Sequence, residues 1–183
     1  SVGARFSGLK LDHLLFIGSN RVAKKVASQA AKNLVPTTLE LGGKSPTIIG
    51  TKANMALAAE RILFSKTLNA GQICLSPDYI FVKKDEKRNL ISELQKAYSK
   101  FFPEPNSHNQ TSIVNKRHLK RMNSYLLDAT KKGATVESLG KNDDLDKNMI
   151  STKIVTEVND GMDVMKHEIF GPILPIMTYD SIS

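Results

Sequence analysis

HLLFIGSNRVAKKVASQAAKNLVPTTLEL, residues 13–41, is the stretch that decides the fold class. Its first six residues form a short apolar run that stops at Gly18, as expected for a buried strand. Residues 21–34 then carry apolar side chains at intervals of four, which is typical of one face of a helix. Pro36 ends that helix, and residues 37–41 read as a second strand. Strand, helix and strand in this order predict an α/β sheet.

The rest of the chain repeats this alternation of strands and helices. Amphipathic patterns predict helices, and short apolar or β-branched runs predict strands. The expected helices cover residues 54–68, 87–102 and 115–132, and the expected strands cover residues 79–83, 135–138, 153–158 and 172–178. We therefore predict an open twisted sheet with helical crossovers, and we find no internal repeat.

Composition places the chain among soluble globular proteins. The 183 residues include 40% hydrophobic and 24% charged residues, and no apolar run reaches the length of a membrane span. A single cysteine, Cys74, excludes an internal disulfide and a cysteine-rich metal cluster, which favours a reducing compartment. We expect a cytoplasmic protein with no membrane partner. The chain starts with Ser-Val-Gly rather than Met, so we expect it to be a piece of a longer protein.

The net charge of +8 would suit an anionic partner such as nucleic acid. The lysines and arginines are spread along the expected helices, and the best candidate patch lies at residues 115–121. No zinc-finger, RRM or KH pattern accompanies them, so a solvated helix face is the better explanation. We therefore expect no nucleic-acid partner, with a basic binding module as an alternative.

Two residues could carry covalent or acid–base chemistry, and each also has an ordinary structural explanation. Cys74 could fill a core as a small hydrophobic side chain, or act as a nucleophile in its thiolate form. The glycine-containing turn before it, residues 70–72, would let backbone N–H groups approach a reacting atom and hold an oxyanion. Glu40 stands directly before Leu41 and two glycines, where it could be a solvent-facing carboxylate or a general base.

Weaker signals lie next to turns. Gly18 and Ser19 stand at an expected strand-to-helix junction, where free N–H groups suit a phosphate, although such pairs are common. Glu168 and Phe170 lie two residues apart before a Gly-Pro turn, so in an extended segment both would point to one side. The four histidines have no metal-ligand spacing, and we expect no metal site; they are His13, His108, His118 and His167.

Three stretches together resemble the NAD(P)-dependent aldehyde dehydrogenase superfamily. They are LELGGKSP at 39–46, GQICLSPDY at 71–79 and EIFGPILPI at 168–176, in the family's order and with similar spacing. The Pro-Asp-Tyr after the cysteine and DHLLFIGS at 12–19 are similar to the branch of coniferyl aldehyde, fatty aldehyde and class 3 dehydrogenases. The resemblance implies an enzyme that oxidises an aldehyde with NAD or NADP.

The resemblance also implies a role for each matching residue. Cys74 matches the nucleophile that attacks the aldehyde carbon to give a thiohemiacetal and, after hydride loss, a thioester. Glu40 matches the base that activates water to hydrolyse the thioester. The residues that match cofactor contacts are Gly18 and Ser19 near the pyrophosphate, Leu41 at the nicotinamide amide, Glu168 at the nicotinamide ribose and Phe170 beside the nicotinamide.

Departures from the family pattern indicate which parts of the family's cofactor and active sites this chain is expected to lack. Ala23 stands where the family usually has glycine, and the family's adenine-ribose lysine and oxyanion-hole asparagine would lie before Ser1. We expect residues 1–41 to be the end of a Rossmann-like cofactor-binding domain, and residues 42–183 to be an incomplete catalytic domain. We expect this piece alone to be inactive, and the longer protein to be a homo-oligomer, as family members usually are.

An acylating dehydrogenase, which passes the acyl group to coenzyme A, is a second enzyme hypothesis. Glu40 argues against it because acylating relatives commonly lack the hydrolytic base. The non-catalytic basic module is the hypothesis from a different class. The sequence selects neither the aldehyde nor one of the two cofactors.

Overall fold

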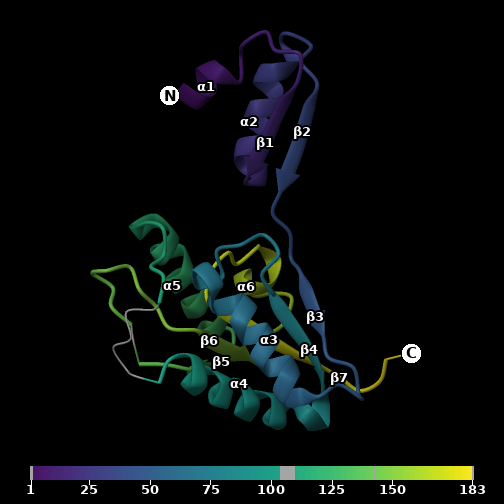
Figure 1. The fold of residues 1–183 in the computed structure, drawn as a ribbon, viewed down its shortest axis with the longest axis vertical. Helices are drawn as coiled ribbons and strands as arrows, with labels where there is room; N and C mark the ends of the chain where they lie inside the picture. Colours follow the sequence, from purple (N-terminus) through teal and green to yellow (C-terminus); the bar gives the residue numbers. More distant parts are fainter. Residues whose placement is uncertain (1, 104–109, 142, 183) are drawn as a thin grey trace. The chain divides into compact units, whose positions relative to one another are not determined.

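The computed structural model of the chain describes residues 2–103, 110–141 and 143–182, so His108 lies outside the described residues. The chain forms two compact units, Ser1–Gly43 and Lys44–Ser183 (Figure 1). Both contain parallel strands joined through helices, and the predicted α/β class is confirmed. The cofactor-binding and catalytic roles expected for the two parts of the chain stay predictions.

The first unit is a strand–helix–strand crossover preceded by the short helix α1 (Val2–Phe6). Strand β1 (Leu14–Gly18) pairs in parallel with β2 (Thr37–Leu41), and α2 (Asn20–Ala31) makes the crossover. A small apolar core joins α2 to the strands, and its buried members are Leu14, Ala30 and Val35. The sequence pattern therefore located β1 and β2 correctly.

Only part of the apolar face of α2 is buried. Val22, Val26 and Ala30 follow the four-residue interval that the sequence shows, and Ala30 is buried, but Val22 is 38% exposed. Ala23 is also buried, at 1% exposure. Ala23, Val26 and Ala30 follow the three- and four-residue steps of one helical face.

The second unit is built on a five-stranded sheet with the strand order β3-β4-β7-β6-β5. Its strands are β3 (Pro46–Ile48), β4 (Tyr79–Lys83), β5 (Thr135–Ser138), β6 (Lys153–Thr156) and β7 (Ile173–Tyr179). The pairs β3–β4, β4–β7 and β7–β6 are parallel, and only β5 runs antiparallel, against β6, among the described strands. The sheet thus brings together segments that are far apart in the sequence.

Helices cover both faces of this sheet. The helices α3 (Met55–Thr67) and α4 (Lys87–Phe101) pack on one face, and α5 (Lys116–Lys131) and α6 (Asp163–Lys166) pack on the other. Side chains alternate along β6, because Ile154 belongs to the first core and Val155 to the second. Within the described residues, no helix is long and apolar enough to cross a membrane.

Some elements were not predicted, because they are too short to show a periodic pattern. They are α1, β3, α6 and the 3-10 turns η1 (Leu68–Gly71) and η2 (Lys84–Glu86). Strand β6 also ends earlier than the expected segment 153–158. Glu157 has a left-handed backbone with φ of 57°, which interrupts the extended conformation.

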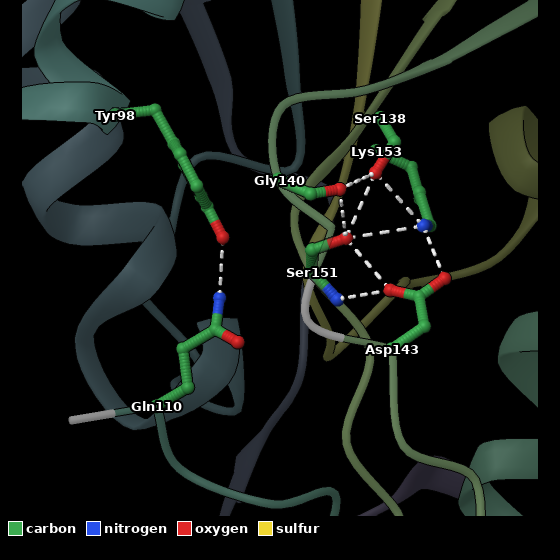
Figure 2. A network of polar contacts seen from close by, with 7 residues as sticks. All are labelled: Tyr98, Gln110, Ser138, Gly140, Asp143, Ser151 and Lys153. Carbon is green, nitrogen blue, oxygen red and sulfur yellow. Dashed lines mark hydrogen bonds and ion pairs between the residues drawn. The ribbon is translucent and has the colours of Figure 1, made fainter. Parts of the chain in front are cut away.

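A polar network fastens the segment between β5 and β6 (Figure 2). Lys153 Nζ forms an ion pair with Asp143 and donates to the hydroxyls of Ser138 and Ser151, at 3.0 and 3.1 Å. The backbone N–H and the hydroxyl of Ser151 both donate to Asp143 Oδ1, at 2.8 and 2.7 Å. Burial opposes ionisation of Asp143, but the hydrogen bonds from Lys153 and Ser151 outweigh it and hold its pKa below the ordinary value.

Candidate active site

The cysteine loop, residues 72–78, connects η1 to β4 and carries Cys74 at its apex. The backbone N–H of Ser76 donates to the carbonyl of Ile73 at 3.0 Å, so Cys74 and Leu75 occupy the centre of a tight turn. Both central residues are exposed, whereas Ser76 is buried. Cys74 therefore does not fill the core of this unit, and its role as a nucleophile stays a prediction.

The chain enters the cysteine loop through three consecutive residues in the left-handed region. The φ angles of Asn69, Ala70 and Gly71 are 50°, 54° and 69°. A Cβ atom on Gly71 would lie 2.6 Å from the carbonyl oxygen of Gly171, which no side chain could tolerate without a shift of the backbone. Glycine at this position therefore allows the loop to approach the segment at Gly171.

The buried side chain of Gln72 holds the start of the cysteine loop in place. Its Nε2 donates to the carbonyls of Asn69 and Ser112, at 3.0 and 3.1 Å. Its Oε1 accepts a hydrogen bond of 2.9 Å from the backbone N–H of Val114. The amide of Gln72 thus ties the loop both to η1 and to the segment before α5.

Lys66, at the end of α3, holds the other side of the loop. Its side chain is 1% exposed, and Nζ donates to the carbonyl of Pro77 at 2.8 Å. Burial lowers the pKa of Lys66 from 10.5 to about 8, opposed by the negative charge of Asp78 and assisted by the positive charge of Lys44. Lys66 is therefore a charged residue on the buried face of its helix.

Asp78 joins the cysteine loop to two other motifs. Its carboxylate is buried, and Oδ1 accepts a hydrogen bond of 2.9 Å from the backbone N–H of Ile169. Oδ2 forms an ion pair with Lys44, whose ammonium also donates to the carbonyl of Val164 at 2.8 Å. Asp78 thereby connects the loop to the GGK stretch and to the segment that contains Glu168 and Phe170.

Glu168 and Phe170 lie on a segment that both sides of the cysteine loop contact. Gly71 packs against Gly171, and Asp78 binds the backbone of Ile169. The segment is not uniformly extended, because Phe170 has a φ of 47°. The expectation that an extended backbone would point Glu168 and Phe170 to one side is therefore wrong in its premise.

One residue of the basic group at 115–121 supports this segment. The guanidinium of Arg121 donates to the backbone carbonyl of Glu168 at 3.0 Å and lies 5.5 Å from the centre of the Tyr125 ring. The pKa of the neighbouring His118 is lowered by partial burial and by the positive charges of Arg121 and Arg117. The basic group is thus not only a solvated helix face.

The remaining candidate residues belong to the first unit. Gly18 ends β1, and Ser19 is the N-cap of α2, although its hydroxyl makes no capping hydrogen bond and the first turn contains no acidic residue. Glu40 is exposed and Leu41 is half-buried at the end of β2. The candidate residues are therefore divided between the two units. Among the residues that the structure describes, no three His, Cys, Asp or Glu side chains form a group that could hold a metal ion.

Sequence reasoning missed the residues that hold the loop, although some signals were present. Lys66 lies four residues after Ile62 and seven after Ala59, both of which are buried, so helical spacing places it on the buried face. Asp78 follows Pro77 directly before a strand whose residues alternate in burial. Gln72 and Arg121 act through backbone groups that are distant in sequence, and no local pattern announces such contacts.

The chain is similar in sequence to proteins of one known family. The chain matches the model of the aldehyde dehydrogenase family over residues 3–183. It is 45% identical to a probable coniferyl aldehyde dehydrogenase of Caulobacter vibrioides, over 99% of this chain and 38% of that protein. It is 44% identical to a coniferyl aldehyde dehydrogenase of a Pseudomonas species, over 97% of this chain and 38% of that protein.

Solved structures give the same picture. The substrate-bound AldH of Staphylococcus aureus has a TM-score of 0.89 and 40% identity, over 97% of this chain and 38% of that one. Betaine aldehyde dehydrogenase of the same species, in complex with NAD+, has a TM-score of 0.86 and 27% identity, over 99% of this chain and 37% of that one. The chain thus spans about 38% of the length of the relatives that it matches.

Proposed function

This chain belongs to the aldehyde dehydrogenase family, and on that premise we propose that the protein carrying it oxidises an aldehyde to a carboxylic acid with NAD or NADP. Cys74 is the nucleophile of this reaction, and Glu40 is the base that activates water. The activity is a proposal because the chain spans about 38% of its relatives' length.

One observation carries the proposal: the exposed thiol of Cys74 lies at the apex of a loop whose two sides are held from within the protein. Gln72 fixes one side, and Lys66 and Asp78 fix the other. A nucleophile must be accessible and must also be kept in one geometry, because small displacements of reacting groups are costly. An exposed thiol on a loop that buried side chains hold in place meets both requirements.

The chemistry assigned to Cys74 and Glu40 uses the aldehyde, an oxidised nicotinamide cofactor and one water molecule. The Cys74 sulfur adds to the aldehyde carbon, and the carbonyl oxygen takes up the proton, which gives a thiohemiacetal. A bound nicotinamide would accept the hydride that leaves this carbon, the hydroxyl group would lose its proton to water, and Cys74 would then carry a thioester. Glu40 removes a proton from water, the water oxygen attacks the thioester carbon, and the acid and the thiol are released.

The start of α2 is suited to the pyrophosphate of a dinucleotide cofactor. Its first turn has no acidic side chain, and the hydroxyl of its N-cap Ser19 makes no capping hydrogen bond, so the N–H groups there are available to an anion. Gly18 and Ser19 would hold that pyrophosphate, and the backbone at Leu41 would contact the nicotinamide amide. Glu168 would accept a hydrogen bond from the nicotinamide ribose, and Phe170 would pack beside the nicotinamide.

We further propose an aromatic, cinnamyl-type aldehyde as the substrate class. The support is the identity of 45% and 44% to relatives that are named as coniferyl aldehyde dehydrogenases. We also keep the expectations of a homo-oligomer and of a cytoplasmic location as predictions.

The test is a dehydrogenase assay of the protein at its natural length, with cinnamyl-type, short aliphatic and long aliphatic aldehydes and with each cofactor. We expect NADH or NADPH to form in the wild type and in Lys96→Ala, a change of an exposed lysine on α4. The Cys74→Ser variant should lose all turnover. Turnover that survives in Cys74→Ser would refute the assignment of the nucleophile.

Two further outcomes separate the alternative functions. If the acid forms without coenzyme A, the acylating hypothesis is excluded; a strict requirement for coenzyme A would support it and would remove the water-activating role from Glu40. Salt-dependent retention of DNA, together with no turnover and no reactivity of Cys74, would support the non-catalytic basic module instead.

A further inference from the structure

A buried amino group lies next to the cysteine loop and has no place in the chemistry derived above. The side chain of Lys66 is 1% exposed, and its ammonium donates to the carbonyl of Pro77 at 2.8 Å. Pro77 follows Cys74 by three residues. The residue before Lys66 also contacts the loop, because the hydroxyl of Ser76 donates to the carbonyl of Ser65 at 3.3 Å. The last turn of α3 is therefore hydrogen-bonded to the part of the loop that leads into β4.

Lysine is an unusual choice for this contact. A charged ammonium loses its hydration when it is buried, and a single carbonyl replaces only one of its water contacts. The charged groups that act on Lys66 are Asp78, at the end of the loop, and Lys44, before β3. Asp78 is itself paired with Lys44, so its charge is shared between the two lysines. A residue such as methionine would fill the same space without this cost.

We propose that Lys66 is a positioning residue for Cys74. Lys66 holds the cysteine loop closed through its hydrogen bond to Pro77, and the loop opens more often when the amino group of Lys66 takes up a proton. The proposal rests on the function proposed for Cys74. It adds a form of regulation to that function, because the position of the Cys74 thiol would depend on the protonation of the Lys66 amino group, which takes no part in the chemistry.

The sign of the pH dependence follows from linkage. In the closed loop the pKa of Lys66 is about 8, since burial disfavours the charged form. When the loop opens and Lys66 reaches water, its pKa returns toward the ordinary value of 10.5. The open loop therefore binds the proton more tightly, and a rise in pH from about 8 to 10 favours the closed loop. One proton of difference gives a change of about ten-fold per pH unit in the opening equilibrium.

Three backbone amides of the loop report on this equilibrium. The N–H groups of Gln72, Ser76 and Asp78 donate to the carbonyls of Asn69, Ile73 and Ser45, at 3.1, 3.0 and 2.9 Å. Hydrogen exchange of the peptide that contains residues 72–78 can be followed by mass spectrometry in the protein at its natural length. The rates are corrected for the base catalysis of free amides, and the matched variants are Lys66→Met and Lys96→Met.

We expect the protection of the loop amides to rise at least five-fold between pH 7.5 and 9.5 in the wild type and in Lys96→Met. In Lys66→Met, the protection should not change with pH. A wild type whose protection is constant would overturn the proposal, even if Lys66→Met fails to fold. An equal rise in wild type and Lys66→Met would overturn it as well, because another group would then be responsible.

A second readout ties the loop to the thiol. The rate at which iodoacetamide alkylates Cys74 is measured over the same pH range, and the ratio of the Lys66→Met rate to the wild-type rate is taken at each pH. We expect this ratio to change at least three-fold, whereas a constant ratio would confine Lys66 to a scaffold role and overturn the proposal. Neither readout needs turnover. Turnover in Cys74→Ser would therefore refute the proposed function while the exchange and alkylation results still decide what Lys66 does.

Discussion

The carboxylate of Asp78 accepts a hydrogen bond of 2.9 Å from the backbone N–H of Ile169, which lies 91 residues further along the chain. The same carboxylate is paired with Lys44. A single buried side chain thus fixes the end of the cysteine loop against the segment that contains Glu168 and Phe170. The geometry of the candidate active site depends on this contact as much as on the residues assigned to the chemistry.

Replacement of Asp78 by alanine should therefore destabilise the protein strongly. The change leaves the ammonium of Lys44 without its partner and the N–H of Ile169 without its acceptor, and losses of this kind cost about 3 kcal/mol. Urea unfolding measures the effect. The matched control is Glu60→Ala, which removes the exposed pair with Lys100 and should cost less than about 1 kcal/mol. Equal losses in the two variants would contradict the role of Asp78.

Replacement of Gly71 by alanine tests the close approach of the loop to Gly171. The new Cβ would sit 2.6 Å from a backbone oxygen, at a residue whose φ of 69° already disfavours side chains. We expect a loss of about 2 kcal/mol or more in unfolding free energy. Gly50→Ala is the control, because a Cβ at Gly50 meets nothing within 4 Å. If Gly71→Ala were as stable as Gly50→Ala, the packing of these two segments would be wrong.

Lys66 should make global stability depend on pH in the alkaline range. Its folded-state pKa of about 8 is below the ordinary value of 10.5, so the unfolded chain binds more protons between these values and stability rises with pH. Lys66 should raise the free energy of unfolding by on the order of 3 kcal/mol when pH rises from below its folded-state pKa to above its ordinary pKa. Urea unfolding at pH 7.5 and 10 measures it, and Lys66→Met should lack the rise.

The stability measurement stops at pH 10 because above this pH Tyr98 lowers the free energy of unfolding, whereas Lys66 raises it. Burial raises its pKa to about 12, so its contribution is present below the ordinary value of 10 and is lost as pH rises through 12. A wild type that lost stability between pH 8 and 10 would contradict the burial of Lys66.

The network around Asp143 predicts a loss of stability in acid. Its pKa is held below the ordinary value, so the stabilisation is present above about pH 4 and is lost as pH falls through the folded-state pKa. Asp143→Asn should lower stability at neutral pH by about 1 kcal/mol, because Asp143 is 42% exposed and solvent screens the pair. The acid dependence should become shallower in the variant. Unfolding curves between pH 2 and 7 measure both effects, and an unchanged acid limb would remove Asp143 from this role.

The sequence predicted the elements that show a clear period. β1, β2 and β4 appear at or within one residue of their expected bounds, and α3 to α5 also match, because each places apolar residues at regular steps. The three residues of β3 are too few for such a pattern. The order β4-β7-β6 joins strands that are distant in sequence, and no local signal specifies which strands become neighbours.

In the candidate site, too, sequence reasoning found the residues with a local signal and missed those that depend on long-range contacts. Cys74 and Glu40 were selected from residue type, position and family resemblance, and their catalytic roles stay predictions. The side chains that hold the cysteine loop were missed, because charged and amide side chains are expected at the surface, whereas Lys66, Gln72 and Asp78 are buried. Their burial is stable only through contacts with backbone groups of other segments, and those contacts exist only in the folded chain.

The central claim, that Cys74 carries the substrate as a thioester, is tested most directly by trapping this species. Glu40→Gln removes the base assigned to hydrolysis, so the thioester should accumulate when the protein at its natural length is mixed with a cinnamyl-type aldehyde and NAD+. Mass spectrometry of the peptide that contains Cys74 should show the added mass of the acyl group, and hydroxylamine should remove it. Turnover in the wild type with no acyl adduct on Cys74 in Glu40→Gln, and with turnover retained in Cys74→Ser, would contradict the account.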